Sequence, residues 1–197
     1  MGTYDDPPAF AFAPLRPHDL PLLVSWLNAP HVRRWFGGGA SAEKVAAEYG
    51  PMARGEVPIT AYIVQLDGRP VGMIDWMRFG DLPELQRLYE VDDPDVANCD
   101  MLIGEPTAVH RGLGAPLVRE FLAQVVFADP RISACVLDPV PDNAVAIRAY
   151  EKAGFRFLRA LPDDGEGNGL YLMELGRSEL GQPARGAEPY YLRPARP

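Results

Sequence analysis

A pair of glycines in the run 110–115 (HRGLGA), at the start of a long amphipathic segment, carries the clearest chemical signal in this sequence. Gly112 and Gly114 let the backbone approach a ligand closely, and the first amides of a helix are unpaired donors at the positive end of its dipole. Such a helix start suits a phosphate group, and Arg111 adds a cation that can fork onto phosphate oxygens. The spacing matches neither a P-loop nor a Rossmann dinucleotide site. A simple helix cap explains the same glycines equally well.

Asp100 is the second position with chemical content, because it interrupts the apolar run 99–103 (CDMLI). An unpaired carboxylate costs several kcal/mol to bury among such neighbours, so it either points into a cleft or is paired. In a cleft it could hold a substrate ammonium group and accept a proton from it, directly or through water. The structural alternative is an Asp near the exposed beginning of a strand.

A third group lies on a predicted helix over residues 142–153, which its first residue, Asp142, would cap. Asn143, Ala146 and Tyr150 are spaced at i, i+3 and i+7, so they share one helix face. From spacing alone, Tyr150 is equally well explained as a core aromatic whose hydroxyl bonds to the backbone. No Ser or Cys stands in a nucleophile motif, so a covalent intermediate is not indicated.

The elements that must position these residues follow from apolar periodicity and from turn and cap signals. Asp67-Gly68 is the turn dipeptide of a hairpin. Residues 78–91 have no clear pattern, with a short strand at 87–91 as one option. Helices are predicted over residues 19–28, 41–53, 112–129 and 142–153, and strands over 11–15, 60–66, 70–77, 98–104, 133–138, 155–161 and 170–175.

Length and composition predict one globular domain with a short tail. The chain has 197 residues, with 19 Lys plus Arg against 27 Asp plus Glu, and a net charge of −8. This acidic balance argues against nucleic-acid and anionic-membrane partners and favours a cationic one. Two cysteines form no disulfide framework or zinc motif. Lacking a signal-peptide pattern or an apolar run of about 18 residues, the chain is expected to be cytoplasmic. The predicted domain covers 1–178, with a loose arm at 1–10 and a Pro-rich tail at 179–197.

The run 109–118 (VHRGLGAPLV) resembles the acetyl-CoA pyrophosphate loop of the GNAT N-acetyltransferases, and 142–155 (DNAVAIRAYEKAGF) resembles their other cofactor-facing helix. The resemblance extends from Pro14 to Leu175. It is greatest to the aminoglycoside 6′-N-acetyltransferases, through the segments 19–38, 57–74, 97–104 and 138–155. It implies an α/β (α+β) fold with a mixed, mostly antiparallel sheet of six to seven strands, helices on both faces, and direct acetyl transfer from acetyl-CoA without a metal. One departure is Val109, where the family has Gln or Arg.

The resemblance also implies roles for individual residues. Asp100 matches the catalytic base and Tyr150 the acid that protonates the departing thiolate. Three further acids could surround a polycationic sugar, although a solvated loop charge is the ordinary explanation for each. A core role for Trp35 is as good as a binding one. The implied acetyl-CoA contacts are Leu102, Ile103, Gly104, Arg111, Gly112, Leu113, Gly114, Ala115, Asn143 and Ala146, and the candidate substrate contacts are Trp35, Phe36, Tyr49, Asp81, Asp138 and Asp164.

Three functions fit this reading. The first is acetylation of a primary amine of a cationic small molecule, with the 6′-amine of an aminoglycoside favoured. The second is N-acylation of a siderophore-type amine or hydroxylamine, or of a peptide amine, by the same fold. The third is a GNAT scaffold that binds drugs without catalysis, against which intact Asp100, Asn143 and Tyr150 speak. A monomer or homodimer is expected in each case.

Overall fold

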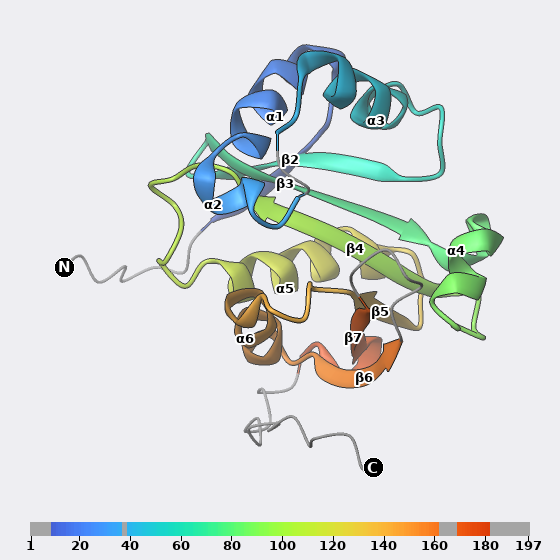
Figure 1. Cartoon of the computed structure of the whole chain (residues 1–197). Coiled ribbons are helices and arrows are strands. Elements are labelled where there is room, and N and C mark those ends of the chain that lie inside the picture. Colours follow the sequence, from blue (N-terminus) through green and yellow to red (C-terminus); the bar gives the residue numbers. More distant parts are fainter. Residues whose placement is uncertain (1–8, 37–38, 162–168, 182–197) are drawn as a thin grey trace, which may run out of the picture.

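The computed structural model describes residues 9–36, 39–161 and 169–181, which contain one seven-stranded mixed sheet (Figure 1). The strand order is β1-β2-β3-β4-β5-β7-β6, and only β4 and β5 run parallel in this part of the chain. The predicted mixed, mostly antiparallel sheet is therefore confirmed. The strands are β1 Phe10–Pro14, β2 Thr60–Leu66, β3 Arg69–Arg78, β4 Val96–Ile103, β5 Ala134–Leu137, β6 Arg156–Leu161 and β7 Leu170–Gly176.

Helices cover both faces of the sheet (Figure 1). α1, α2 and α3 lie on one face, α5 and α6 pack together on the other, and α4 lies at one end of the sheet. The longest helix in the described residues, α3, has 13 residues, well short of the about 20 apolar residues that span a bilayer. The helices are α1 Leu20–Leu27, α2 Pro30–Arg33, α3 Ala42–Arg54, α4 Pro83–Leu88, α5 Gly114–Gln124 and α6 Ala144–Ala153.

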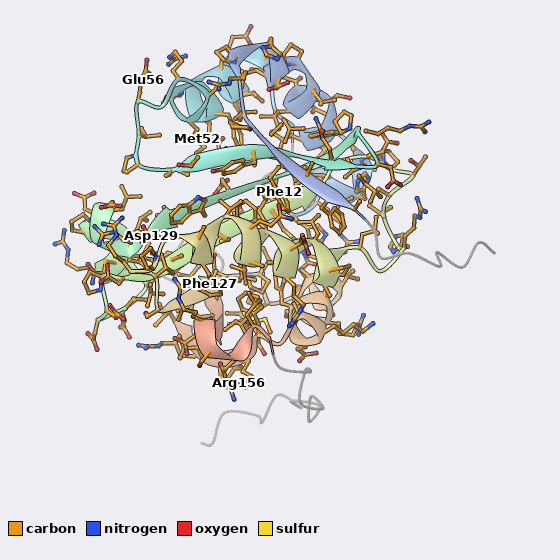
Figure 2. The ribbon with its side chains drawn as sticks, turned by 180° about the vertical axis from the view of Figure 1, so that it is seen from behind. Phe12, Met52, Glu56, Phe127, Asp129 and Arg156 are labelled. Atoms are coloured by element: carbon orange, nitrogen blue, oxygen red, sulfur yellow. The ribbon has the colours of Figure 1, made fainter. Side chains whose placement is uncertain are left out.

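The central strands bury both faces, because neighbouring side chains alternate between two hydrophobic clusters. On β3, Met73 packs with α1 and α3, whereas Ile74 packs with α5. Figure 2 shows the molecule from behind, with Phe12 labelled. The ring of Phe12 meets that of Phe121 edge to face, with 5.0 Å between their centroids. Residues of even number on β4 lie on the α3 face, as Leu102 does, which places the Asp100 position on that face too.

The sheet divides between β4 and β5. Only Val96, Ala97 and Asn98 of β4 pair with β5, opposite the range 134–136, whereas β3 accompanies β4 as far as Ile103. From Cys99 onward, the edge of β4 that faces β5 therefore has no strand partner among the described residues. An unpaired strand edge offers its backbone groups to a ligand.

The predicted elements are largely confirmed, and the caps explain why. Ser41 begins α3 by accepting a hydrogen bond from Lys44 N–H at 3.3 Å, and Gly55 ends it in a left-handed conformation, φ +69°. Gly154 ends α6 in the same way, at φ +104°. Both signals are local in sequence, so they are readable without the fold.

Four details of that prediction are wrong. Asn143 caps α6 rather than Asp142, because its side chain accepts from Ala146 N–H at 3.2 Å. The helix expected over 112–129 begins at Gly114, ends at Gln124 and continues as a 3-10 turn, which buries Val126 and Phe127. Residues 87–91 form no strand. Finally, Phe10 is buried at the start of β1 rather than belonging to a loose arm.

The segment between β3 and β4 is helical where an irregular chain was expected. Pro83 fits the first turn of α4, where a missing N–H costs nothing. Leu85 and Tyr89, four residues apart, face a small cluster around the fully buried Phe79. At the other end of the chain, the described residues reach Gly181, beyond the expected boundary at 178, and Leu180 packs against the α5 side.

Replacing Gly104 by Ala should destabilise the fold by about 2 kcal/mol, because a β-carbon there would lie 2.0 Å from the Trp26 ring and force the core apart. Urea unfolding monitored by circular dichroism measures the change. Gly181→Ala is the matched control, since nothing lies within 4 Å of that position. Equal midpoints for Gly104→Ala and wild type would contradict this packing.

Candidate active site

A pocket of about 440 Å³ lies between α2, the end of β4, the start of α5 and one face of α6. Leu113, at the N-cap position of α5, supplies no side-chain hydrogen bond, so the first amides of the helix are left for a ligand. Gly112 turns the chain into the helix at φ +76°, a conformation that a β-carbon would strain. These features make the start of α5 an anion site at the pocket wall.

The pocket wall is basic although the chain as a whole is acidic. Its basic side chains include His31 of α2 and Arg34, which directly follows α2. They also include His110 from the loop before α5, and Arg148 and Lys152 of α6. Within the described residues, no Asp or Glu lines the pocket. Cations around an uncapped helix start suit a ligand that carries several phosphates.

One face of α6 forms the opposite wall. Asn143 both caps this helix and lines the pocket, and Ala146 follows one turn later. Tyr150, a further turn along, is 6% exposed and also lines the pocket. Burial, followed by the negative charges of Asp100 and Asp138, raises the pKa of its phenol, which therefore stays protonated and able to donate.

The unpaired edge of β4 supplies backbone groups to the same pocket. The Ile103 carbonyl accepts a hydrogen bond from His31 Nε2–H at 3.0 Å, so it points away from β3. The Leu102 carbonyl, in contrast, points at Gly72 of β3. Because backbone groups alternate along a strand, those of Met101 and Ile103 point to the pocket side and those of Leu102 do not. Two of these four groups have partners already, the Ile103 carbonyl in His31 and the Met101 N–H in Asp100.

On the α3 face of the sheet, two carboxylates stand directly across from each other. Asp75 of β3 and Asp100 of β4 are cross-strand partners, and Asp100 is exposed within an otherwise buried stretch of β4. Surrounding protein, then the charges of Asp138 and Glu48, raise the pKa of Asp100 to about 7, against a hydrogen bond from Met101 N–H. Burial and the charge of Asp100 raise the pKa of Asp75 as well. The negative charge of Asp100 therefore disfavours ionisation of the Asp75 carboxyl.

Asp138, in the loop after β5, adds a third carboxylate to this acidic group. It accepts hydrogen bonds from the Tyr89 hydroxyl at 2.7 Å and from Asn98 Nδ2 at 3.1 Å. Glu48 of α3 lies beside the buried Tyr49 and adds a fourth negative charge. Within the described residues, none of these four carboxylates forms an ion pair. The acidic group therefore suits a ligand with more than one positive charge.

The negative charge of Asp100 thus acts on Tyr150 from the opposite side of the sheet, at the place where β4 leaves β5. One side of this gap is basic with an uncapped helix start, and the other is acidic. A proton acceptor with a pKa near neutrality stands opposite a phenol that keeps its proton. Such a pair can take a proton from one reactant and give one to another.

Comparison with known proteins identifies this arrangement. The sequence profile described as Acetyltransferase (GNAT) domain matches residues 16–162. The chain belongs to the GNAT acetyltransferase family. The resemblance found in the sequence is confirmed.

Relatives of known name agree with this GNAT assignment. The chain is 36% identical over 142 residues to aminoglycoside N(6′)-acetyltransferase type 1 of Klebsiella pneumoniae, which covers 70% of this chain and 69% of the relative. It is 29% identical over 154 residues to lysine N-acyltransferase MbtK of Mycolicibacterium paratuberculosis, covering 78% and 67%. The structure of AAC(6′)-Ib in complex with ribostamycin and coenzyme A matches with a TM-score of 0.79 at 28% identity, covering 91% of this chain and 99% of that one.

The structure brings most of the predicted cofactor contacts of this GNAT protein into one pocket. It also places the predicted aromatic pair there. Gly104 does not line the pocket, since it packs on Trp26 and its N–H bonds to Val71, and Arg111 lies in the exposed loop beside it. The lining includes Trp35, Phe36, Leu102, Ile103, Gly112, Leu113, Gly114, Ala115, Asn143, Ala146 and Tyr150.

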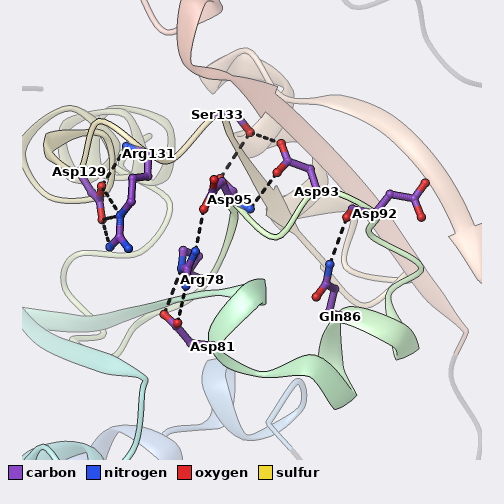
Figure 3. Close-up of polar contacts among 9 residues, drawn as sticks. All are labelled: Arg78, Asp81, Gln86, Asp92, Asp93, Asp95, Asp129, Arg131 and Ser133. Atoms are coloured by element: carbon purple, nitrogen blue, oxygen red, sulfur yellow. Dashed lines mark hydrogen bonds and ion pairs between the residues drawn. The ribbon is translucent and has the colours of Figure 1, made fainter.

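The predicted substrate acids do not all come together. Asp138 joins the acidic group, with Tyr49 buried beside it. Asp81 instead forms an ion pair with Arg78 at 2.6 Å, and Arg78 also binds Asp95 at 2.7 Å (Figure 3). The Asp81 charge is compensated in this network, away from the pocket. Asp164 lies outside the described residues.

Several residues of the site were missed by sequence reasoning. Asp75 interrupts an apolar strand just as Asp100 does, so the same argument would have found it. Glu48 precedes Tyr49 in a predicted helix and gives no separate signal. Tyr89 and Asn98 reach Asp138 only through the fold, as His31 reaches Ile103.

Replacing Gly114 by Ala should weaken coenzyme A binding about tenfold, because its β-carbon would lie 3.2 Å from the Ala149 β-carbon and move α5 from α6. Isothermal titration calorimetry measures the affinity. The double variant Gly114→Ala, Ala149→Gly removes that contact and should restore binding. Binding that stays weak in the double variant would show that the new methyl group blocks the ligand directly.

Replacing Asp75 by Asn should stabilise the fold more at alkaline than at acid pH. The folded-state pKa of Asp75 is raised, so wild type loses stability as pH rises through that pKa, whereas the amide does not titrate. Urea unfolding at about pH 4 and about pH 8 should show the difference growing toward pH 8. Asp92→Asn, at an exposed loop position, is the control. A difference that is constant with pH would contradict the burial of this charge.

Proposed function

We propose that this chain transfers the acetyl group of acetyl-CoA to a primary amine of a polycationic small molecule, with the 6′-amine of an aminoglycoside as the favoured acceptor. The observation that carries the proposal is the separation of charge across the gap beside β4. A basic wall with an uncapped helix start suits the anionic donor, and unpaired carboxylates on the other side suit the cationic acceptor. The proposed donor places the activity in the cytoplasm, where acetyl-CoA is available.

The donor's fit rests on the pocket itself. The uncapped amides of Gly114 and Ala115 receive the diphosphate, with Arg148 and Lys152 close by. The backbone of Met101 and Ile103 lies along the pantetheine arm, as an added strand would. These groups orient the thioester toward the gap where Asp100 lies.

Asp100 makes the acceptor amine reactive. With a pKa near 7, its carboxylate holds the ammonium group and takes one proton from it, so the neutral amine attacks the thioester carbonyl. A carbon–nitrogen bond forms, the carbon–sulfur bond breaks, and the thiolate leaves with a proton from Tyr150. The second amine proton passes to solvent, and proton exchange with solvent restores both groups. No covalent enzyme intermediate is needed.

A thiol-release assay with acetyl-CoA tests the proposal against kanamycin, ribostamycin, lysine, N-hydroxylysine and a short peptide panel. Acetylation of the aminoglycosides, with the product located at the 6′-amine by mass spectrometry, is the expected result. Activity confined to the lysine compounds would favour the second reading, which the similarity to a lysine N-acyltransferase supports. Coenzyme A binding without release of thiol from any acceptor would exclude an enzyme.

Replacing Asp100 by Asn should lower kcat by about 10²-fold and leave coenzyme A affinity unchanged, because the amide cannot take the amine proton. In wild type, kcat/KM should fall as pH decreases below about 7, where Asp100 becomes protonated. Steady-state kinetics over a pH series measures both effects. Unchanged turnover in this variant would remove Asp100 as the base.

A further inference from the structure

The carboxylate of Asp138 is held in an unusual way. Each of its oxygens accepts one hydrogen bond, Oδ2 from the Tyr89 hydroxyl at 2.7 Å and Oδ1 from Asn98 Nδ2 at 3.1 Å. The two donors come from different elements, Tyr89 from the end of α4 and Asn98 from β4. Contacts to both oxygens fix the plane of the carboxylate as well as its position.

Both donors are themselves fixed. Asn98 is 9% exposed, and its Nδ2 group also donates to the Val136 carbonyl at 3.2 Å, so both of its amide hydrogens are used. The ring of Tyr89 lies against that of Phe79, with 5.3 Å between centroids. The backbone N–H of Tyr89 donates to the Leu85 carbonyl at 2.9 Å. The carboxylate is therefore held by groups that cannot turn away from it.

The charge of Asp138 is stabilised without being cancelled. Tyr89 and Asn98 are neutral, whereas Asp81 and Asp129 elsewhere in the molecule are paired with arginines at 2.6 and 2.7 Å (Figure 3). Asp138 therefore projects its negative charge into the gap, where it raises the pKa of Asp100. A carboxylate serving only the fold gains most from a cationic partner.

We propose that Tyr89 and Asn98 are positioning residues, which hold the Asp138 carboxylate in place as the anchor for a second ammonium group of the acceptor. The proposal rests on the proposed function, since it assumes a polycationic acceptor. It gives α4 a role in acceptor specificity: this segment, which the sequence shows as irregular, carries the hydroxyl that orients the anchor. Neither residue touches the reacting atoms, so both act through Asp138.

Three variants test this proposal: Tyr89→Phe, Asp138→Asn and the two combined. Tyr89→Phe keeps the ring against Phe79 and should raise the KM for kanamycin about fivefold, with kcat and the KM for acetyl-CoA nearly unchanged. The double variant should match Asp138→Asn alone, because the hydroxyl acts only through that carboxylate. Tyr62→Phe, in the core beside Phe121, is the matched control and should leave kcat and both KM values unchanged.

An activity-independent readout separates this proposal from the proposed function. Four other titratable groups interact with Asp100, namely Asp75, Glu48, Tyr49 and Tyr150. The Tyr89→Phe substitution leaves all four in place. Releasing the Asp138 carboxylate should therefore lower the pKa of Asp100 measured by carboxyl NMR. If wild type acetylates no amine, the proposed function and the anchor role fail together. The titration then still shows whether Tyr89 holds the Asp138 carboxylate in place. A kanamycin KM equal to that of wild type in Tyr89→Phe, or additive effects in the double variant, would overturn the positioning role.

Discussion

The separation of β4 from β5 is the constraint on which the site depends. After three paired positions that end at Asn98, the two strands separate, and β4 continues to Ile103 beside β3 while β5 stays beside β7. One strand edge is thereby left open in the middle of a sheet, which is costly unless a ligand or a side chain meets its backbone groups. His31 meets one of them, at the Ile103 carbonyl, and the pocket gives access to the others. The same opening lies between Asp100 on one face of the sheet and Tyr150 on the other, which are the proposed base and acid.

Charge is sorted around this opening in a way that net charge alone does not reveal. The chain carries −8, yet Arg34, Arg148 and Lys152 gather at the pocket. Asp75 and Asp100 lie on the α3 face. Surrounding protein and the charges of nearby carboxylates, Asp138 and Glu48 among them, raise the pKa of both. Leaving carboxylates unpaired costs stability in the free protein, and the proposed cationic acceptor would relieve that cost on binding. Function and stability are in opposition at this place.

Arginines elsewhere illustrate the contrast. Arg78 joins Asp81 and Asp95, while Arg177 donates to the Ile132 carbonyl at 2.7 Å and to the Phe127 carbonyl at 2.6 Å. These contacts tie together loops at the ends of strands, where backbone carbonyls lack strand partners. The charge of Asp81 is therefore compensated within the framework, whereas the four carboxylates of the acidic group have no cationic partner among the described residues. Asp81 and Asp138 thus differ in their partners, an arginine for the first and two neutral groups for the second.

Local signals determined much of what the sequence alone could predict. Ser41, Gly55 and Gly154 mark helix ends, Asp67-Gly68 marks a hairpin, and the glycine loop before α5 marks an anion site, because each works through neighbours a few residues away. The tertiary structure alone decided the rest. Strand register placed Asp75 opposite Asp100. The gap beside β4 leaves Tyr150 of α6 near Asp100, and the packing of α4 lets the Tyr89 hydroxyl donate to Asp138. These contacts join residues distant in the chain, and periodicity carries no information about which of them meet.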